Sequence, residues 1–290
     1  MSFIDAHHHV WDLERRPQPW IDPVVLAPIH RSFGLDDLRP VAEVAGITAT
    51  VLVQCINNLD ETREFLALAA EDPLVAGVVG WVDLEAPDVA ATLADLQSGP
   101  GGFGLVGIRH QVQSEPDPDW LTRPAVLRGL AALGEAGLVF DLLVLPVQLP
   151  AALAAVRARP EVLFVLDHLA KPPLADGDLT AWEQGVRALA ERPNLVAKFS
   201  GLVTEASWEK WTTDDLRPVA DVALEAFGPS RLMFGSDWPV CLLAADYGQV
   251  VAAASELVLS ELTPAQKQDF RAGTAARTYR LALDDPKGAS

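Results

Sequence analysis

The sequence is poor in cysteine and in basic residues. Its 290 residues include only two cysteines, Cys55 and Cys241, which lie far apart and show no metal-ligand spacing. This spacing predicts that both cysteines are buried, apolar side chains of a protein in a reducing compartment. It argues against a disulfide framework. The 22 lysines and arginines are outnumbered by 40 aspartates and glutamates, which leaves a formal net charge of −18. Because the electrostatic field of a chain with this net charge repels polyanions, we expect no nucleic-acid partner.

Long apolar segments are also missing. Aspartate, basic residues, proline or glycine interrupt every hydrophobic run before it could cross a bilayer, and the first residues lack the pattern of a signal peptide. We therefore expect a cytoplasmic protein with no membrane partner. The loop after the first predicted strand carries no Gly-x-Gly-x-x-Gly motif, which disfavours a dinucleotide fold. No linker, repeat or low-complexity segment divides the chain, so residues 1–290 are predicted to form one domain.

Hydrophobic residues make up half of the chain, in short β-rich runs that alternate eight times with amphipathic segments rich in Ala and Leu. The runs are apolar almost throughout, which is typical of parallel strands covered by helices. Strands are predicted at 3–9, 48–54, 75–82, 105–110, 138–144, 162–168, 195–200 and 231–237. Helices are predicted at 36–45, 60–71, 87–97, 124–136, 150–159, 180–192 and 214–227, followed by two or three more, one with a capping box at Thr263–Gln266. The pattern predicts an α/β fold, a single (β/α)8 TIM barrel with extra C-terminal helices.

Three consecutive histidines follow the apolar start of the first predicted strand. The period of two in a strand places Asp5, His7 and His9 on one face, with both imidazoles at its carboxyl end. Imidazole is the commonest protein ligand for an ion such as Zn²⁺, so the pair is a candidate metal site. A buried structural pair is the alternative. An expression tag is disfavoured because the run leads directly into Val10 and Trp11 without a spacer.

Polar residues also accumulate at the carboxyl ends of the other predicted strands, where TIM barrels carry their active sites. The set comprises His7, His9, Gln54, Trp81, Asp83, Arg109, His110, His168, Lys198, Ser200 and Asp237. Four of the six histidines thus meet an aspartate at one rim, which scattered structural histidines would not do. His8 points to the opposite face and His30 lies in a loop, so we expect supporting roles for both.

Four motifs in this pattern resemble the amidohydrolase superfamily, in its amidohydrolase-2 branch of TIM-barrel hydrolases. They are Asp5-Ala6-His7-His8-His9-Val10-Trp11, Gly107-Ile108-Arg109-His110, Asp167-His168-Leu169-Ala170-Lys171-Pro172 and Phe234-Gly235-Ser236-Asp237-Trp238-Pro239. They span almost the whole chain, and the first and last are characteristic of the branch. Within it, the set resembles sugar-lactone hydrolases of the L-fuconolactonase and L-rhamnonolactonase type.

The resemblance implies metal or substrate ligands on four side chains, which are His7, His9, His168 and Asp237. Binuclear members add a carboxylated lysine or a glutamate from strand 4, whereas here that strand ends in Arg109-His110. We therefore expect at most one divalent metal, with zinc as the first candidate. Some relatives in this branch work without a metal, so a metal-independent enzyme is the alternative.

Lactone hydrolysis needs an activated water, a group that stabilises charge on the carbonyl oxygen, and a proton for the departing hydroxyl. Asp237 is predicted to be the general base, while His168, with His7 and His9, polarises the carbonyl directly or through zinc. The predicted catalytic residues are therefore Asp237 and His168. The predicted substrate contacts are Arg109, His110, Gln54, Lys171 and three tryptophans near strand ends, Trp11, Trp81 and Trp238.

These substrate contacts have structural alternatives. Arg109 could instead form an ion pair across the barrel mouth, for instance with Asp141. The tryptophans could pack in the core, and Lys171 could be a surface charge on a loop. Asp141 lies inside a predicted strand and needs a partner, because an unpaired buried carboxylate is costly.

We predict an enzyme of carbohydrate metabolism, a hydrolase whose partner is a small-molecule sugar lactone. The field of a chain with net charge −18 favours neutral six-carbon aldonolactones over dicarboxylated lactones. The enzymatic alternatives on the same barrel are a metal-dependent decarboxylase and a hydrolase of a carboxylated lactone. A non-enzymatic sugar-binding protein is a third alternative, but it would not need an aspartate facing three histidines. The sequence leaves the oligomeric state open.

Overall fold

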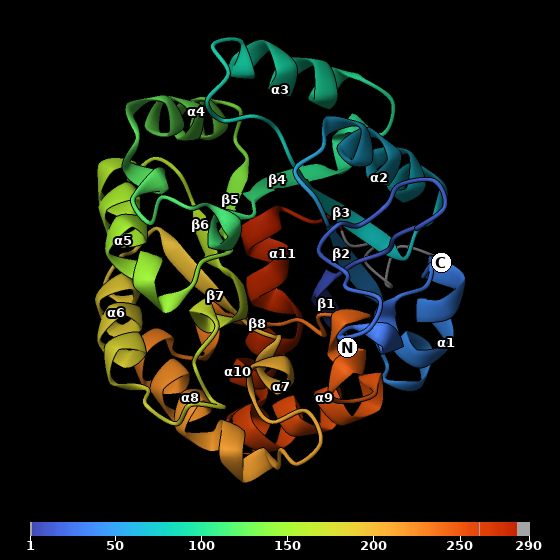
Figure 1. The fold of residues 1–290 in the computed structure, drawn as a ribbon, viewed down its shortest axis with the longest axis vertical. Helices are drawn as coiled ribbons and strands as arrows, with labels where there is room; N and C mark the ends of the chain where they lie inside the picture. The colour runs from blue at the N-terminus through green and yellow to red at the C-terminus, as the bar shows by residue number, and fades with distance from the viewer. Residues whose placement is uncertain (1, 261, 283–290) are drawn as a thin grey trace.

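Eight parallel strands form a barrel at the centre of the molecule, in the order β1 to β8 (Figure 1). The structure, a computed structural model, describes residues 2–260 and 262–282. The strands are β1 (Ile4–His8), β2 (Ala49–Val53), β3 (Val75–Gly80), β4 (Leu105–His110), β5 (Val139–Leu142), β6 (Phe164–Leu166), β7 (Leu195–Phe199) and β8 (Leu232–Phe234). The barrel closes where Asp237 N donates to His7 O at 2.8 Å and His9 N donates to Trp238 O at 2.7 Å. The predicted (β/α)8 fold is confirmed.

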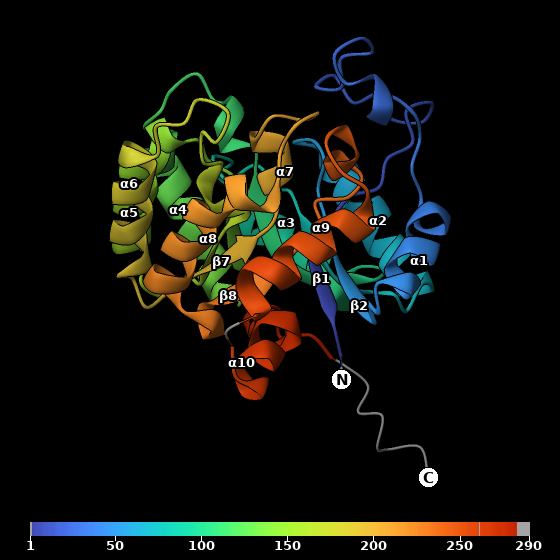
Figure 2. The same ribbon diagram turned by 90° about the horizontal axis from the view of Figure 1, so that it is seen from below.

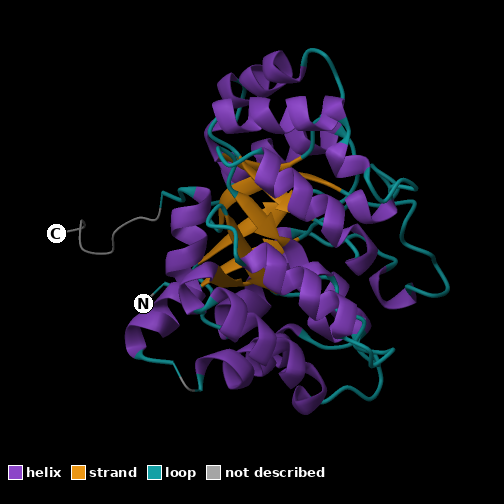
Figure 3. Ribbon diagram, turned by 90° about the vertical axis from the view of Figure 1, so that its left-hand side faces the viewer, coloured by secondary structure: helices purple, strands orange, loops and turns teal. Residues whose placement is uncertain are grey.

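Most of the helices surround the strands on the outside (Figure 3). The helices are α1 (Leu35–Val44), α2 (Leu59–Glu71), α3 (Val89–Ser98), α4 (Pro124–Glu135), α5 (Leu149–Ala158), α6 (Thr180–Ala190), α7 (Leu202–Glu205), α8 (Thr213–Phe227), α9 (Tyr247–Ala254), α10 (Pro264–Gln268) and α11 (Thr274–Tyr279). Local sequence signals mark where helices begin. At the start of α10, for example, Thr263 is the N-cap and forms the predicted capping box with Gln266. Among the residues described, no helix combines the length and the hydropathy needed to cross a membrane.

The C-terminal segment closes one end of the barrel. In the view of Figure 1, α11 lies in the middle of the ring of strands. Ala272, Ala275 and Tyr279 belong to the same apolar cluster as Ile4 and Ala49, the first residues of β1 and β2. The extra C-terminal helices therefore cover the amino-terminal end of the barrel, which leaves the carboxyl ends of the strands open to a ligand.

Strands 6 and 8 are shorter than the sequence predicts. The pattern predicts that they run to His168 and Asp237, but β6 ends at Leu166 and β8 ends at Phe234. The reason is a left-handed backbone: the four residues from His168 to Lys171 have φ between 49° and 60°, and Asp237 has φ of 57°. This conformation costs non-glycine residues about 1–2 kcal/mol each. Such strain is concentrated at functional sites, where it aims side chains.

A long connection between β1 and α1, residues 9–34, projects beyond the carboxyl ends of the strands (Figure 2, dark blue). It crosses this end of the barrel without forming an α-helix, and Trp11 pairs with Phe33 across its two ends through N–H···O bonds of 3.0 and 2.9 Å. The connection therefore places its side chains above the residues that end the strands.

Candidate active site

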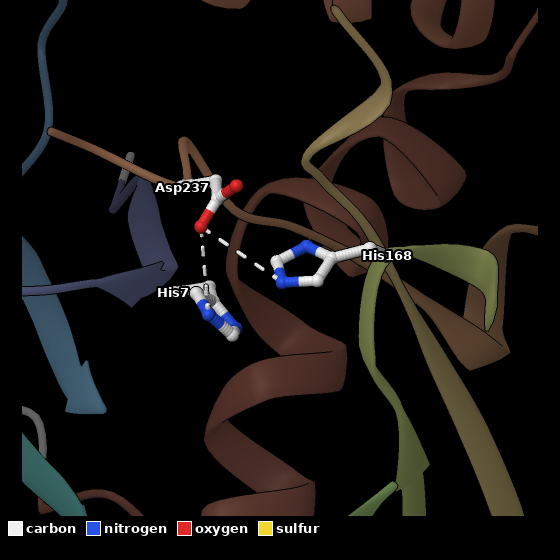
Figure 4. Close-up of side chains that lie close together, drawn as sticks. All are labelled: His7, His168 and Asp237. Carbon is white, nitrogen blue, oxygen red and sulfur yellow. Dashed lines mark ion pairs between the residues drawn. The ribbon is translucent and has the colours of Figure 1, made fainter. Parts of the chain in front are cut away.

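Three imidazoles and a carboxylate converge at the carboxyl ends of β1, β6 and β8. Asp237 Oδ1 lies 3.5 Å from His9 Nε2 and 3.8 Å from both His7 Nε2 and His168 Nε2. His7 Nε2 and His9 Nε2 are 3.2 Å apart. Figure 4 shows the carboxylate of Asp237 pointing at His7 and His168. The structure thus brings together the four side chains for which the resemblance implies metal or substrate contacts.

A buried carboxylate on β1 joins the strands that carry this group. Asp5 accepts hydrogen bonds from Ser236 N at 2.8 Å, Ser236 Oγ at 2.6 Å and Tyr247 OH at 2.9 Å. Burial raises the pKa of Asp5 above its usual value even against these bonds. The contacts hold the segment after β8 against β1, so Asp5 places Asp237 beside His7.

Two glycines leave the space that the imidazoles occupy. A Cβ atom on Gly235 would lie 2.7 Å from His7 Cβ, and one on Gly201 would lie 2.6 Å from His168 Nδ1. Gly201 also has φ of +66°, a conformation that other residues rarely adopt. A larger residue at either position would displace a histidine of the site.

The pKa shifts of these four side chains are those of a carboxylate base that faces neutral imidazoles. Burial lowers the pKa of His7, His9 and His168 below its usual value, for His168 to about 4. His9 Nδ1 lies 2.7 Å from Val53 O, which assigns its proton to Nδ1 and leaves the Nε2 lone pair facing the site. Burial alone would raise the pKa of Asp237, but the neighbouring His168 and His9 outweigh it and leave that pKa below its usual value. Asp237 is therefore ionised at pH 7.

A buried ion network lies beneath the histidines. Lys198 Nζ is 2.6 Å from Asp141 Oδ2, 3.0 Å from Asp167 Oδ1 and 3.0 Å from His7 Nδ1. Tyr279 OH donates to Asp141 Oδ2 at 2.9 Å. Burial raises the pKa of Asp141 to about 6, whereas for Asp167 the effect of burial is outweighed by Lys198 and His7, so its pKa lies well below the usual range. The partner that Asp141 needs is thus a lysine of the protein.

Arg109 completes this network from β4. Its Nη1 lies 3.1 Å from Asp167 Oδ2 and 3.2 Å from His7 Nε2, and its Nη2 donates to Gln54 Oε1 at 3.0 Å. Arg109 does form an ion pair across the barrel mouth, as the structural alternative predicted, but its partner is Asp167 and not Asp141, which is paired with Lys198. Asp167 was not among the predicted site residues, although its place directly before a strand-end histidine is a usable signal in the sequence.

A cavity of about 170 Å³ opens above this group of side chains. It is lined by His9, Trp20, Cys55, Arg109, Gln111, Gln113, Ser114, Leu143, His168, Lys171, Asp237 and Val240. Sites for drug-sized ligands have volumes of roughly 300–1,000 Å³, so this cavity is suited to a small molecule.

Arg109 and Lys171 are the predicted substrate contacts that line the cavity. The ammonium group of Lys171 is paired with Glu205 at 2.7 Å. Trp20, which was not among the predicted site residues, also lines the cavity. No periodic pattern marks a residue in an irregular, proline-rich connection, so the sequence carried no signal for this position.

Trp11 and Trp238 are placed behind the cavity wall, which corrects the prediction that they face the substrate. Both are almost fully buried, and each packs edge to face against Phe33, at centroid distances of 5.6 and 5.4 Å. Trp11 Nε1 donates to Arg31 O at 2.7 Å. Both rings are buried because they pack against the ring of Phe33, so they do not face a ligand in the cavity.

Trp81, His110 and Gln54 also lie outside the cavity lining that the described residues form. Trp81 Nε1 donates to His110 Nδ1 at 3.1 Å, and the His110 ring stacks on Trp120 at a centroid distance of 4.1 Å. Gln54 is bound to Arg109. These three predicted contacts therefore support the site through other side chains, because their polar atoms are engaged within the protein.

Three of the convergent side chains, His7, His168 and Asp237, fit a single metal ion. Tetrahedral zinc with bonds of about 2.0–2.1 Å spaces its ligand atoms roughly 3.3 Å apart, and His7 Nε2 and His168 Nε2 each lie 3.8 Å from Asp237 Oδ1. His7, His168 and Asp237 can each offer one ligand atom within 4.8 Å of the others, and all three are buried. The guanidinium of Arg109, 3.2 Å from His7 Nε2, opposes a dication at that atom.

Comparison with known proteins places this site in a family. The family model described as amidohydrolase matches residues 4–281. The L-fucono-1,5-lactonases of Burkholderia multivorans and Burkholderia ambifaria are each 40% identical, over 99% of this chain and 98% of theirs. A crystal structure of an amidohydrolase from Burkholderia multivorans with bound zinc is 39% identical, with a TM-score of 0.91 over 97% of this chain and 100% of that one. The chain belongs to the amidohydrolase family.

Proposed function

We propose that the protein hydrolyses a neutral sugar lactone with Asp237 as general base. The observation that carries this proposal is a carboxylate, Asp237, that lies within 3.8 Å of three imidazoles and lines a small cavity together with His9, His168 and the guanidinium of Arg109. The first substrate to test is L-fucono-1,5-lactone, because the two Burkholderia relatives at 40% identity are L-fucono-1,5-lactonases.

The proposed reaction follows from the protonation states. Asp237 accepts a proton from water as the water oxygen bonds to the lactone carbonyl carbon. The guanidinium of Arg109, which lines the cavity, supplies positive charge that stabilises the carbonyl oxygen as negative charge develops on it. Asp237 then returns the proton to the ring oxygen as its bond to the carbonyl carbon breaks. Water and lactone are thereby converted into one hydroxy acid.

One zinc ion is the proposed metal, and its ligands would be His7, His9, His168 and Asp237. When bound, it would act as a Lewis acid toward the carbonyl group. The zinc-bound relative at 39% identity supports this site. Arg109 already supplies positive charge 3.2 Å from His7 Nε2, so we expect part of the activity to remain when the metal is removed.

The charges around the cavity favour a neutral lactone over an acid. Lys171 is paired with Glu205 at 2.7 Å, and Arg109 is paired with Asp167 at 3.1 Å. The two lysine or arginine side chains that line the cavity therefore each have a carboxylate partner already, which weakens their attraction for a charged substrate. A decarboxylase or a hydrolase of a carboxylated lactone would need such cations free to bind its substrate, so both alternatives are disfavoured.

The experiment is a pH-indicator assay of acid release from a panel of lactones, with and without a chelator. We expect saturable, enzyme-dependent opening of L-fucono-1,5-lactone, with kcat/KM at least roughly tenfold above that for 2-pyrone-4,6-dicarboxylate, or ~1.4 kcal/mol in transition-state binding. Buffer and heat-denatured protein provide the spontaneous rate. A preference for the dicarboxylate would contradict the proposal.

A further inference from the structure

We propose that Trp20 is a substrate-binding residue, whose indole ring forms the wall against which one face of the lactone ring packs. This inference rests on the proposed function and names a contact within the same site. Trp20 comes from the β1–α1 connection and lines the cavity together with His9 and Asp237. It is only partly buried, so part of its surface is available to a ligand.

An indole suits one face of a sugar lactone. Such a ring has apolar C–H faces and a polar edge of hydroxyl groups, and a tryptophan buries the apolar face at a low cost in side-chain entropy. The polar edge can then meet hydrogen-bonding side chains that also line the cavity, namely Gln111, Gln113 and Ser114. The cavity therefore offers both kinds of contact that a neutral sugar ring requires.

Two buried side chains hold the ring of Trp20 by its polar edge. Trp20 Nε1 donates to Gln18 Oε1 at 3.0 Å, and Gln18 Nε2 donates to Glu61 Oε1 at 3.4 Å. Glu61 Oε2 in turn accepts hydrogen bonds from Cys55 N at 2.8 Å and Ile56 N at 3.1 Å. Gln18 and Glu61 are 5% and 2% exposed, so this chain is solvent-protected. Both act on the substrate only through Trp20 and are positioning residues.

A series of aromatic contacts holds the ring from behind. Trp20 packs edge to face on Trp11 at a centroid distance of 5.5 Å, Trp11 on Phe33 at 5.6 Å, and Phe33 on Trp238 at 5.4 Å. Trp238 directly follows Asp237 in the chain. The series thus ties the proposed binding surface to the segment that carries the base. It also gives Trp11 and Trp238 a role, although neither lines the cavity.

The test compares Trp20→Ala, Trp20→Phe and Gln18→Met with the wild-type protein. Removing the ring should raise KM for L-fucono-1,5-lactone at least about tenfold while kcat changes less than about threefold, because the contact is the same in ground and transition states. Trp20→Phe keeps a flat ring and should recover most of the loss. Gln18→Met removes the hydrogen bond and should raise KM about threefold with little change in kcat.

The matched control is Phe103→Ala, which removes an aromatic ring that is 83% exposed just before β4, at the opposite end of the barrel. It should leave both constants unchanged. Thermal unfolding is measured for every variant, and where Trp20→Ala does not fold, Trp20→Phe and Gln18→Met decide. Wild-type kinetic constants in a folded Trp20→Ala, or equal losses of kcat and kcat/KM, would overturn the assignment of Trp20.

A binding measurement separates this inference from the proposed function. Titration with L-fuconate should quench the tryptophan fluorescence of the wild-type protein, and much less that of Trp20→Phe. If the wild type opens no aldonolactone, the proposed function fails by itself. Quenching that is absent, or equal in both proteins, would then reject Trp20 as a binding surface as well.

Discussion

Lys198 Nζ lies 2.6 Å from Asp141 Oδ2, and both side chains are completely buried beneath the site histidines. Two charges at this depth are tolerated only because each has a close partner and further hydrogen bonds. Tyr279 supplies one of these bonds to Asp141, and Lys198 also faces His7 Nδ1 at 3.0 Å. The pair therefore links the C-terminal helix, which closes the barrel, to the histidines at its open end.

Replacing Lys198 with methionine should destabilise the protein strongly. The change keeps most of the side-chain volume but leaves Asp141 and Asp167 without their shared cation, and breaking a buried pair in this way costs about 3–5 kcal/mol. The measurement is the free energy of unfolding in urea. In a double variant with Asp141→Asn, the loss should be smaller than the sum of the two single losses. Additive losses would mean that the two side chains do not interact.

Asp237→Asn should abolish most turnover without unfolding the protein. It removes the base but preserves the volume of the side chain, and a general base contributes roughly 10²–10⁴-fold to rate. We therefore expect kcat for the best lactone of the panel to fall at least about 100-fold. Asp221→Asn on the exposed surface of α8 is the matched control. Near wild-type turnover in Asp237→Asn would remove this carboxylate from the mechanism.

The purified protein should bind no more than one zinc ion per chain. After loading with zinc and gel filtration, elemental analysis should give one zinc ion per chain or fewer. His9→Gln should lower zinc affinity at least about tenfold, because it removes one of the proposed ligands. His8→Gln is the control, since His8 Nε2 is engaged by Thr50 Oγ1 at 2.9 Å. Two ions per chain would contradict the single-metal site.

Glu205→Gln should shift substrate preference toward carboxylated lactones. The change frees the ammonium group of Lys171, which now lies 2.7 Å from Glu205 at the cavity. A freed cation beside a carboxylate substrate should raise its kcat/KM a few-fold, while that of a neutral lactone stays constant. Glu209→Gln, an exposed change close in the sequence, is the control. Equal effects on both substrates would show that Lys171 does not contact them.

The buried histidines should make stability fall in acid. Burial lowers the pKa of His8 from 6.5 to about 3. Between these values the unfolded chain binds a proton that the folded chain does not, so the free energy of unfolding decreases as pH falls from 6.5 toward 3. Between pH 6.5 and pH 5, the free energy of unfolding of His8→Gln should therefore fall by about 2 kcal/mol less than that of the wild type. A pH slope in His8→Gln equal to that of the wild type would contradict the shift.

Much of the fold and part of the site could be predicted from sequence because they depend on periodicity. Apolar runs without alternation indicate parallel strands covered by helices, and eight of them indicate a barrel. In this fold the ends of the strands share one rim, so the strand-end positions of His7, Arg109, His168 and Asp237 sufficed to bring them together. Neither inference requires knowledge of a side-chain contact.

The partners of the buried charges were decided by the tertiary structure. Arg109 and Asp141 are paired in the register of β4 and β5, yet Arg109 forms its ion pair with Asp167 just after β6 and Asp141 with Lys198 on β7. Which side chains meet across a barrel depends on the tilt and stagger of its strands, which a single sequence does not reveal. The left-handed backbone at His168 and Asp237 is equally invisible, because neither is a glycine.

The barrel and the rim where the histidines meet Asp237 follow from the sequence, because hydrophobic periodicity and strand direction are local properties of the chain. That Trp20 lines the cavity while Trp11 and Trp238 stand behind it follows from tertiary packing alone. All three tryptophans are close to strand ends or to the rim, and their chemistry is the same. Their roles differ because an irregular connection folds back over the barrel, and its path is set by packing among residues far apart in the sequence.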